Sequence, residues 1–598
     1  MKLSYSIGKS KVGKEVDKGS FMLTNRIGGY AHFSNEPNSR YQGFFFNDEL
    51  KMLRVVEGIS LVKKSPIKNL KNIFYSVERE HDNGVVESFF MPLNSNSLVY
   101  ELNNENEVDI SIDIKESYDN RQFGRIYNIE VDGDKIIVTF TKRTNLGEDE
   151  SEGQEEYAVY LAIKPDKLNY EIIDEWQKRV YSDDKERASM PYERYVYSAL
   201  RLKAKSLVFS ASKNREEAIK ESAKVFENRN KLKKESERSI NKFIKSPTIK
   251  KIKNNETKLA YISALNSLDG LRIKTKREEG IFAGLPWFFQ LWARDELISL
   301  KGLLSLSSGS AKNVLMRYFF NLKEGKLRSR FHEESISSSD AVGWLYFRTK
   351  EAFNKKIFNK NEIKKITKIL EENIGYLIKN NTKDDFAVCK ERETWMDSLN
   401  RDGALIELQA FRLFMYKFLF ELTKNKKYKK LEDKLKDKVR GRFWNKRYLA
   451  DGLNDNPVRP NVFIAAYIYP ELLSKEEWSN CFKHILPRLF AGWGGLTTVD
   501  KGSEFFVENH TGEDPKSYHN GDSWFWVNNL AALVLNRINR KKFKDYINKI
   551  LDAGVKEILY SGISGCAAEL SSAKELKSEG CLNQAWSNAM FIELIEEA

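Results

Sequence analysis

The hydrophobic pattern of the chain changes near residue 212, and this change limits the possible folds most strongly. Before it, apolar and polar residues alternate, and turn residues such as Asp132-Gly133 separate the alternating segments. The alternation is clearest in Val108–Lys115, Lys135–Lys142, Tyr157–Lys164 and Tyr197–Ala211. Successive side chains of a strand point to opposite faces, so this pattern predicts strands with one buried face. We predict an N-terminal antiparallel β-sandwich over residues 1–212.

The rest of the chain has the periodicity and composition of helices. Residues 213–254 are highly charged, and Asn214–Ser239 contains neither Gly nor Pro, which predicts a long exposed helix and a helical linker. From residue 255 to 598, apolar segments of helical period alternate with loops rich in Trp, Gly and Asp. The predicted helices there include Ala311–Lys323, Asn361–Ile378, Ala404–Leu422, Lys475–Leu489 and Asp522–Ile538.

Composition excludes several classes of protein. No apolar run approaches the roughly 18 residues of a membrane helix, and the first 15 residues, MKLSYSIGKSKVGKE, lack the apolar core of a signal peptide. The four cysteines form no C-x-x-C pair, so we expect a cytoplasmic protein with reduced thiols. The net charge is +14, but basic and acidic residues are interleaved, and a solvated surface explains this better than nucleic-acid binding. We expect neither nucleic acid nor membrane as a partner.

Tryptophan is concentrated in the second half, where ten of the eleven residues lie at or after Trp287. Several stand beside acids or glycines in loops rather than on helix faces. Such tryptophans can line a cleft that stacks on flat apolar faces and binds polar rims, as a sugar ring presents. Ordinary burial in the core is the alternative for each of them.

Carboxylates in these loops are candidates for acid–base chemistry. Asp397 follows Trp395, and an indole beside a carboxyl raises its pKa by desolvation, which suits a general acid. Glu569 follows a run of small residues far along the chain. Glycoside hydrolysis requires two such carboxyls, one to protonate the leaving oxygen and one to act on water or the anomeric carbon. Capped helix starts and solvated turns are the alternatives.

The order of the motifs resembles the amylo-α-1,6-glucosidase (glycogen debranching) family, a six-hairpin α/α-barrel group related to glucoamylases. The matching segments are Pro286-Trp287-Phe288, Trp292-Ala293-Arg294-Asp295, Thr394-Trp395-Met396-Asp397, Arg401-Asp402-Gly403, Glu407, Tyr518–Trp524, Glu569 and Gln584-Ala585-Trp586-Ser587. Phe21–Phe46, which contains a Leu-Thr-Asn-x-x-Gly-Gly-Tyr core, is similar to the N-terminal domain of prokaryotic debranching proteins.

This resemblance implies the fold and an activity. The fold would be an N-terminal antiparallel β-sandwich followed by a C-terminal (α/α)₆ barrel, with domains at 1–212, 213–254 and 255–598. The activity would be inverting, exo-acting release of glucose from α-1,6 branch points of glycogen or limit dextrin. Asp397 would be the general acid and Glu569 the general base, with carboxyls roughly 6.5–9.5 Å apart. No metal or organic cofactor is implied, and the partners would be glycogen or branched α-glucan oligosaccharides.

The resemblance also assigns substrate-binding residues. Arg294, Asp295 and Asp340 would hold the hydroxyls of the terminal glucose. The predicted contact residues are Trp292, Arg294, Asp295, Asp340, Trp395, Arg401, Glu407, Tyr518, His519, Trp524, Gln584 and Trp586.

The loop around Glu569 reads Ala567-Ala568-Glu569-Leu570, which departs from the usual family context, and Glu575 is the nearest alternative carboxylate. A glucoamylase-like exo-α-1,4-glucosidase and a non-catalytic glucan-binding protein are the alternative functions. Glucanotransferase activity is unsupported, and the oligomeric state is not readable from the sequence.

Overall fold

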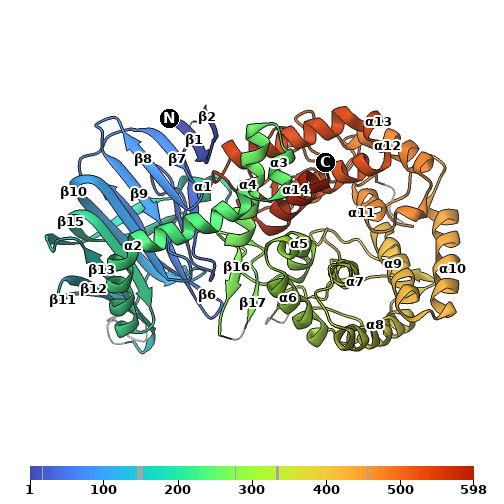
Figure 1. Cartoon of the computed structure of the whole chain (residues 1–598), viewed down its shortest axis with the longest axis horizontal. Helices are drawn as coiled ribbons and strands as arrows, with labels where there is room; N and C mark the ends of the chain where they lie inside the picture. The colour runs from blue at the N-terminus through green and yellow to red at the C-terminus, as the bar shows by residue number, and fades with distance from the viewer. Residues whose placement is uncertain (17, 145–152, 277, 332–335, 454–456, 598) are drawn as a thin grey trace. The chain divides into compact units, whose positions relative to one another are not determined.

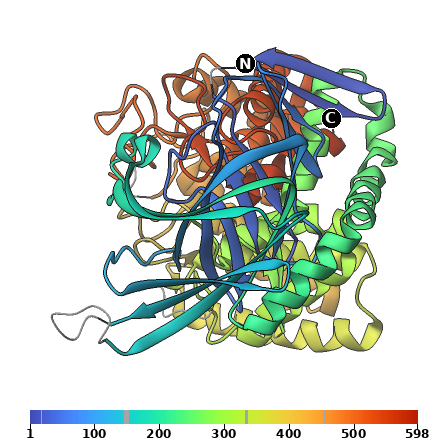
Figure 2. The same cartoon turned by 90° about the vertical axis from the view of Figure 1, so that its left-hand side faces the viewer.

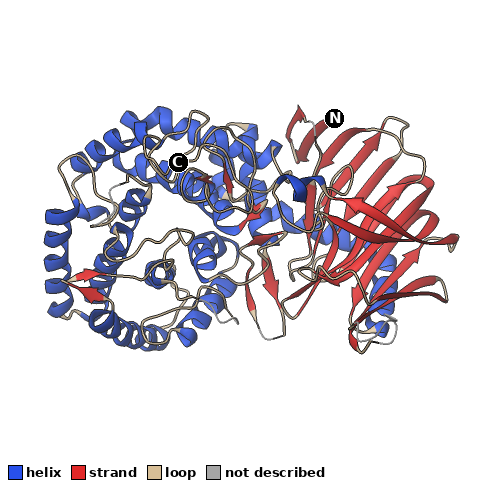
Figure 3. Cartoon of the chain, turned by 180° about the vertical axis from the view of Figure 1, so that it is seen from behind, coloured by secondary structure: helices blue, strands red, loops and turns tan. Residues whose placement is uncertain are grey.

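The computed structural model describes residues 1–16, 18–144, 153–276, 278–331, 336–453 and 457–597. The chain forms two compact units. The first contains Met1–Glu278 and Ile558–Gly565, and the second contains Glu279–Glu557 and Cys566–Ala598. Strands are concentrated in the first unit and helices in the second (Figure 3). The predicted domain limits at 212 and 254 remain a prediction.

The first unit is built on one large, branched sheet (Figure 2). Its strands are β1 (Lys2–Ile7), β2 (Ser10–Glu15), β3 (Phe21–Thr24), β4 (Tyr30–Phe33), β5 (Gly43–Asp48), β6 (Lys51–Leu61), β7 (Ile67–Asn72), β8 (Ser76–His81), β9 (Val86–Phe90), β10 (Ser97–Glu116), β11 (Arg125–Asp132), β12 (Lys135–Arg143), β13 (Glu155–Pro165), β14 (Tyr170–Val180) and β15 (Glu193–Ser212). The pairs are antiparallel, with β1–β7 a parallel exception. The four alternating segments lie in β10, β12, β13 and β15, as predicted.

Two 20-residue strands, β10 and β15, make the sheet fold into two layers. Residues of β10 from Val99 to Leu102 pair with β9, whereas those from Val108 onward pair with β6. The β10–β15 ladder contains a register shift between these regions, from Glu101 to Asn106, and such bulges bend strands. The end of β15 likewise pairs with β13, and its beginning pairs with β14. Phe21 of β3 packs on Phe89 of β9, with ring centroids 5.1 Å apart, so apolar side chains join the layers.

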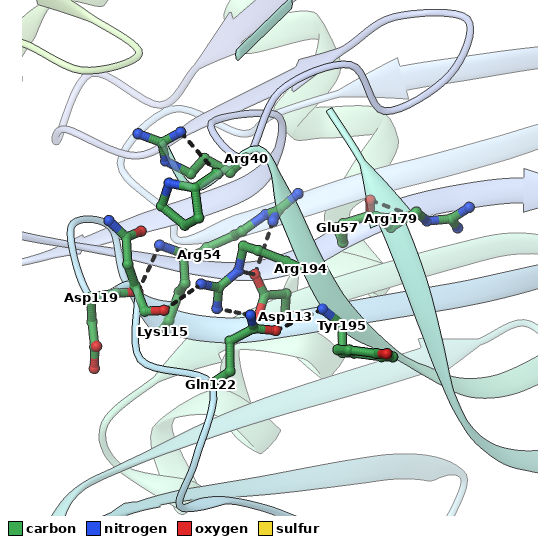
Figure 4. Close-up of polar contacts among 12 residues, drawn as sticks. Arg40, Arg54, Glu57, Asp113, Lys115, Asp119, Gln122, Arg179, Arg194 and Tyr195 are labelled. Atoms are coloured by element: carbon green, nitrogen blue, oxygen red, sulfur yellow. Dashed lines mark hydrogen bonds and ion pairs between the residues drawn. The ribbon is translucent and has the colours of Figure 1, made fainter. Parts of the chain in front are cut away.

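A buried charged cluster connects strands of this unit (Figure 4). Asp113 of β10 forms ion pairs with Arg54, Arg125 and Arg194 at 3.0, 3.2 and 3.2 Å. Burial alone would raise the pKa of Asp113, but Arg194 and Arg54 outweigh it and hold the pKa well below its usual range. These arginines extend from β6, β11 and β15, so the cluster links four strands through one carboxylate.

Helices α1 (Ser182–Glu186), α2 (Arg215–Ile244), α3 (Pro247–Lys251) and α4 (Asn255–Gly270) complete the first unit, with β16 (Arg272–Lys274). The predicted long helix is α2, capped by Asn214, whose side chain accepts from the Glu217 N–H. It packs on the sheet through Ala218 and Val225 and is therefore not exposed on all sides (Figure 1).

The second unit contains α5 (Ala293–Leu306), α6 (Ser308–Asn321), α7 (Ser339–Asn354), α8 (Lys360–Asn380), α9 (Ile406–Thr423), α10 (Lys426–Phe443), α11 (Asn461–Ile468), η2 (Pro470–Leu472), α12 (Lys475–Leu489), α13 (Phe525–Tyr560, ending in the first unit) and α14 (Ala585–Glu597). Its short strands are β17 (Glu279–Ile281), β18 (Gly284–Leu285), β19 (Thr382–Lys383), β20 (Phe386–Ala387), β21 (Ser523–Trp524), β22 (Leu570–Ser571) and β23 (Asn583–Gln584). Asn539 interrupts α13 with non-helical φ −160° and ψ 80°. Each helix predicted there has a counterpart.

The burial of these helices separates an inner set from an outer set. Helix α9 is buried on nearly every face, whereas α8, α10 and α12 bury one stripe each, as helices on the outside of a bundle do. The inner helices contact one another in the order α14, α5, α7, α9 and α11. Helices α7 and α9 approach closely at Gly343, where an added Cβ would lie 2.2 Å from the ring of Phe411.

Candidate active site

One cavity of the second unit collects most of the predicted site residues. Its volume is about 320 Å³. The lining residues are Ala283, Phe288, Trp292, Arg294, Asp295, Trp395, Asp397, Tyr518, Trp524, Glu569, Gln584 and Trp586. Most of them precede or begin helices α5, α9, α13 and α14. The fold thus brings motifs that are distant in the sequence together at the N-termini of helices around one cavity.

Arg294 connects one proposed catalytic carboxyl to the barrel wall. It lies in the first turn of α5, and its Nε donates to both oxygens of Asp340 at 3.0 and 2.9 Å. One terminal nitrogen donates to Asp397 Oδ2 at 3.3 Å, and the other donates to Ser338 Oγ at 3.1 Å. The Arg294 side chain is 5% exposed, and these partners fix the orientation of its guanidinium.

Asp397 lies in the loop that precedes α9, with its side chain 39% exposed toward the cavity. Trp395 fixes this loop, because its indole N–H donates to Asn461 Oδ1 at 2.6 Å, at the start of α11. Burial among protein atoms raises the pKa of Asp397, and the adjacent Arg294 opposes that increase.

Glu569 lies in the loop between α13 and α14 and is 2% exposed. Its Oε1 accepts from the Tyr518 hydroxyl at 2.6 Å, and its Oε2 accepts from the Cys581 N–H at 2.9 Å. Burial raises the pKa of Glu569 to about 7, although both donors favour the carboxylate. Strands β21 and β22 pair Trp524 with Leu570, which holds the loop of Tyr518 beside that of Glu569.

A third carboxyl, Asp295, faces the same cavity from α5. Gln584 donates to its Oδ1 at 2.8 Å, and Gln584 is held by pairing with Gly284. Burial raises the pKa of Asp295 to about 8, and the charge of Glu569 adds to this increase. Asp295 therefore holds its proton more firmly than an ordinary aspartate.

Aromatic rings form the rest of the wall. Trp395 contacts Trp524 edge-on with ring centroids 5.5 Å apart, and Trp524 contacts Trp586 at 5.6 Å. His519 stacks on Trp524 at 4.9 Å, and burial lowers its pKa well below the usual value, so the ring is neutral. Large apolar faces beside a few fixed polar groups are suited to a sugar ring.

Four predicted contact residues do not line this cavity. Asp340 lies behind Arg294, and His519 lies behind Trp524. Arg401 and Glu407 pair at 3.0 Å, and Arg401 also donates to Asp451 at 2.5 Å, forming a buried cluster beside the loop. The alternative carboxylate Glu575 is exposed and does not line the cavity.

Other residues were not found from the sequence. Phe288 and Ala283 line the cavity but were not among the predicted contact residues. Phe288 could have been predicted, because it belongs to the Pro-Trp-Phe motif. Asp522 accepts from Ser517 at 2.7 Å and contacts His510 at 2.8 Å, which braces the loop of Tyr518. Asp522 stands within the matching segment Tyr518–Trp524, whereas Ser517 carried no signal in the sequence.

Within the described ranges, no three His, Cys, Asp or Glu side chains are arranged to bind a metal ion. No helix in the described part of the chain has both the length and the apolar character needed to cross a membrane.

Comparisons with known proteins agree with this architecture. The family profile described as amylo-alpha-1,6-glucosidase matches residues 256–593, more than half of the chain. Among solved structures, a bacterial glucoamylase complexed with acarbose is similar, with a TM-score of 0.62 and 12% identity over 98% of this chain and 96% of that one. No relative was found among the curated proteins. The predicted fold class, an antiparallel β-sandwich followed by an (α/α)₆ barrel, is confirmed. The chain belongs to the amylo-alpha-1,6-glucosidase family.

Proposed function

We propose that the protein is an inverting exo-glycosidase that releases glucose from α-1,6 branch points of an α-glucan such as glycogen or limit dextrin. The observation that carries this proposal is that two loop carboxyls, Asp397 and Glu569, line one aromatic cavity. Its volume of about 320 Å³ is at the lower end of the ~300–1,000 Å³ range of ligand sites, which favours a chain end over a long cleft.

In the proposed reaction, Asp397 donates its proton to the glycosidic oxygen as the bond to the anomeric carbon breaks. Glu569 removes a proton from water, whose oxygen attacks the anomeric carbon from the opposite face. The product is β-glucose, and the two carboxyls return to their starting protonation through solvent. No other reactant is required.

The surroundings of each acid support its role. Arg294 orients Asp397 at 3.3 Å, while burial favours the protonated form that a general acid needs. Tyr518 and the Cys581 N–H point two donors at Glu569, which favours the carboxylate that a base needs. Asp295 and Gln584 present a fixed pair of polar groups for a sugar hydroxyl.

The test follows the anomer of glucose released from a 6-O-α-glucosyl oligosaccharide by proton NMR. Early β-glucose supports both the linkage and inversion, whereas early α-glucose contradicts the roles of the acid pair. Release from maltotriose but not from this substrate indicates an exo-α-1,4-glucosidase. No release from either indicates a glucan-binding protein.

Variants test the two acids. Asp397→Asn and Glu569→Gln preserve shape but not acid–base function, so each should lose about 10²–10⁴-fold in kcat. Circular dichroism and thermal melting check that the fold is intact. A near-wild-type rate in either variant contradicts its assigned role.

A further inference from the structure

A second cavity of the second unit lies beside the one that holds the acids. Its volume is about 500 Å³, within the ~300–1,000 Å³ range of ligand sites. Its wall includes the side chains of Asn400, Asp402, Arg459, Phe505 and Asn520. None of these lines the first cavity.

The two cavities share their walls through two loops. In one loop, Trp395 and Asp397 line the first cavity, and the four residues from Leu399 to Asp402 line the second. In the other loop, Tyr518 lines the first cavity and Asn520 lines the second. Between these positions, Ser398 Oγ and His519 Nδ1 are hydrogen-bonded at 2.7 Å, which joins the loops. A ligand that fills the first cavity therefore has the second as its neighbour across a two-residue wall.

The second cavity suits an uncharged polyhydroxyl ligand. Phe505 is 52% exposed, and an exposed ring at a cavity offers a face for stacking. Asn400 and Asp402 are exposed polar side chains that supply hydrogen-bonding groups. Arg459 donates to the carbonyls of Thr498 and His519 at 3.1 and 2.8 Å, so this guanidinium is already engaged.

Charge gives a second reason to exclude an anion. The other guanidinium at this cavity, Arg401, is paired with Glu407 and Asp451. The exposed carboxylate of Asp402 would repel a phosphate or a carboxylate ligand. A glucosyl unit meets neither obstacle.

We infer that the second cavity binds glucosyl units of the α-glucan chain from which the terminal glucose is removed. This inference rests on the proposed function for the identity of the chain. When the terminal glucose occupies the first cavity, the remaining chain has to leave through its mouth. The neighbouring cavity then supplies a stacking face and polar groups to that chain, and affinity rises with its length.

The test is equilibrium binding in an Asp397→Asn background, which separates binding from turnover. The probes are isomaltose and a 6-O-α-glucosyl maltopentaose, measured by titration calorimetry. Adding Phe505→Ala should reduce affinity for the long probe about tenfold, as truncation of an aromatic anchor does, and leave isomaltose unchanged. Asp402→Ala is a second variant of the same cavity and should act in the same direction.

Phe320→Ala is the matched control, because Phe320 is 73% exposed on α6 and lines neither cavity. It should leave both affinities unchanged. Equal affinity of the long probe for the background and for both cavity variants overturns the inference. A wild-type enzyme that releases no glucose contradicts the proposed function alone, because the binding comparison is still decided by Phe505.

Discussion

Replacing Tyr518 with Phe should move the pH profile of the enzyme in a defined direction. The Tyr518 hydroxyl donates to Glu569 Oε1 at 2.6 Å, and this bond stabilises the carboxylate over the carboxylic acid. The phenyl ring keeps the aromatic wall and removes only that donor. Without it, Glu569 should hold its proton to a higher pH.

The size of the effect follows from the strength of such a bond. A hydrogen bond to a charged group contributes ~1.5–3 kcal/mol. One pKa unit corresponds to ~1.36 kcal/mol. The pKa of Glu569, about 7 in the wild type, should therefore rise by about one to two units in Tyr518→Phe.

The assay is the pH dependence of kcat/KM, whose acidic limb reports the base of the free enzyme. A base must lose its proton to act, so activity should rise with pH through about 7 in the wild type and about one to two pH units higher in the variant. Tyr428→Phe is the matched control, since its hydroxyl donates to Glu371 at 3.1 Å and neither residue lines the cavity. A limb that stays in place, or moves to lower pH, would refute the reasoning.

Three further substitutions have defined outcomes. Arg294→Lys should lower kcat/KM about 100-fold, because one ammonium cannot hold Asp340 and Asp397 together as the guanidinium does; unchanged steady-state kinetics would contradict this. Burial raises the pKa of Glu557 to about 8, above the ~4.3 of an unfolded chain, so this group lowers the free energy of unfolding as pH rises between those values. Glu557→Gln should therefore raise Tm more at pH 8.5 than at pH 5 in paired melting curves, and a uniform change would argue against it. Glu407→Ala leaves a buried arginine short of a partner and should cost about 3–5 kcal/mol in denaturant unfolding; a rise in KM without loss of stability would instead support its predicted contact with substrate.

The sequence predicted the structure best where one hydrophobic period extends along a whole strand or helix. Alternation located β10, β12, β13 and β15, because half-buried strands repeat their burial every two residues. It did not reveal that β10 and β15 each serve two layers, since a bulge depends on partners that are distant in the chain. Nor did it show that α2 packs on the sheet, because its charged residues conceal a narrow apolar stripe.

The sequence motifs predicted residues that line the cavity, but the sequence did not predict the residues that surround them. Residues such as Trp395 and Glu569 line the cavity as the motif order suggested. Arg401 and Glu407 stand in the same motifs, but their charges pair with each other behind the wall. The motifs contain both residues that line the cavity and residues that support it, and only the fold distinguishes the two groups. Phe505, at the second cavity, has no motif and therefore gave no signal.

The two-residue ladder between β21 and β22 couples two loops of the candidate active site. It pairs Ser523 with Ser571 and Trp524 with Leu570, and so sets the loop of Tyr518 in register with the loop of Glu569. A one-residue slip of one strand against the other would turn its side chains to the opposite face. The positions of the two loops therefore depend on each other. We expect a transfer of this site to another barrel to require both segments, since each one positions the other.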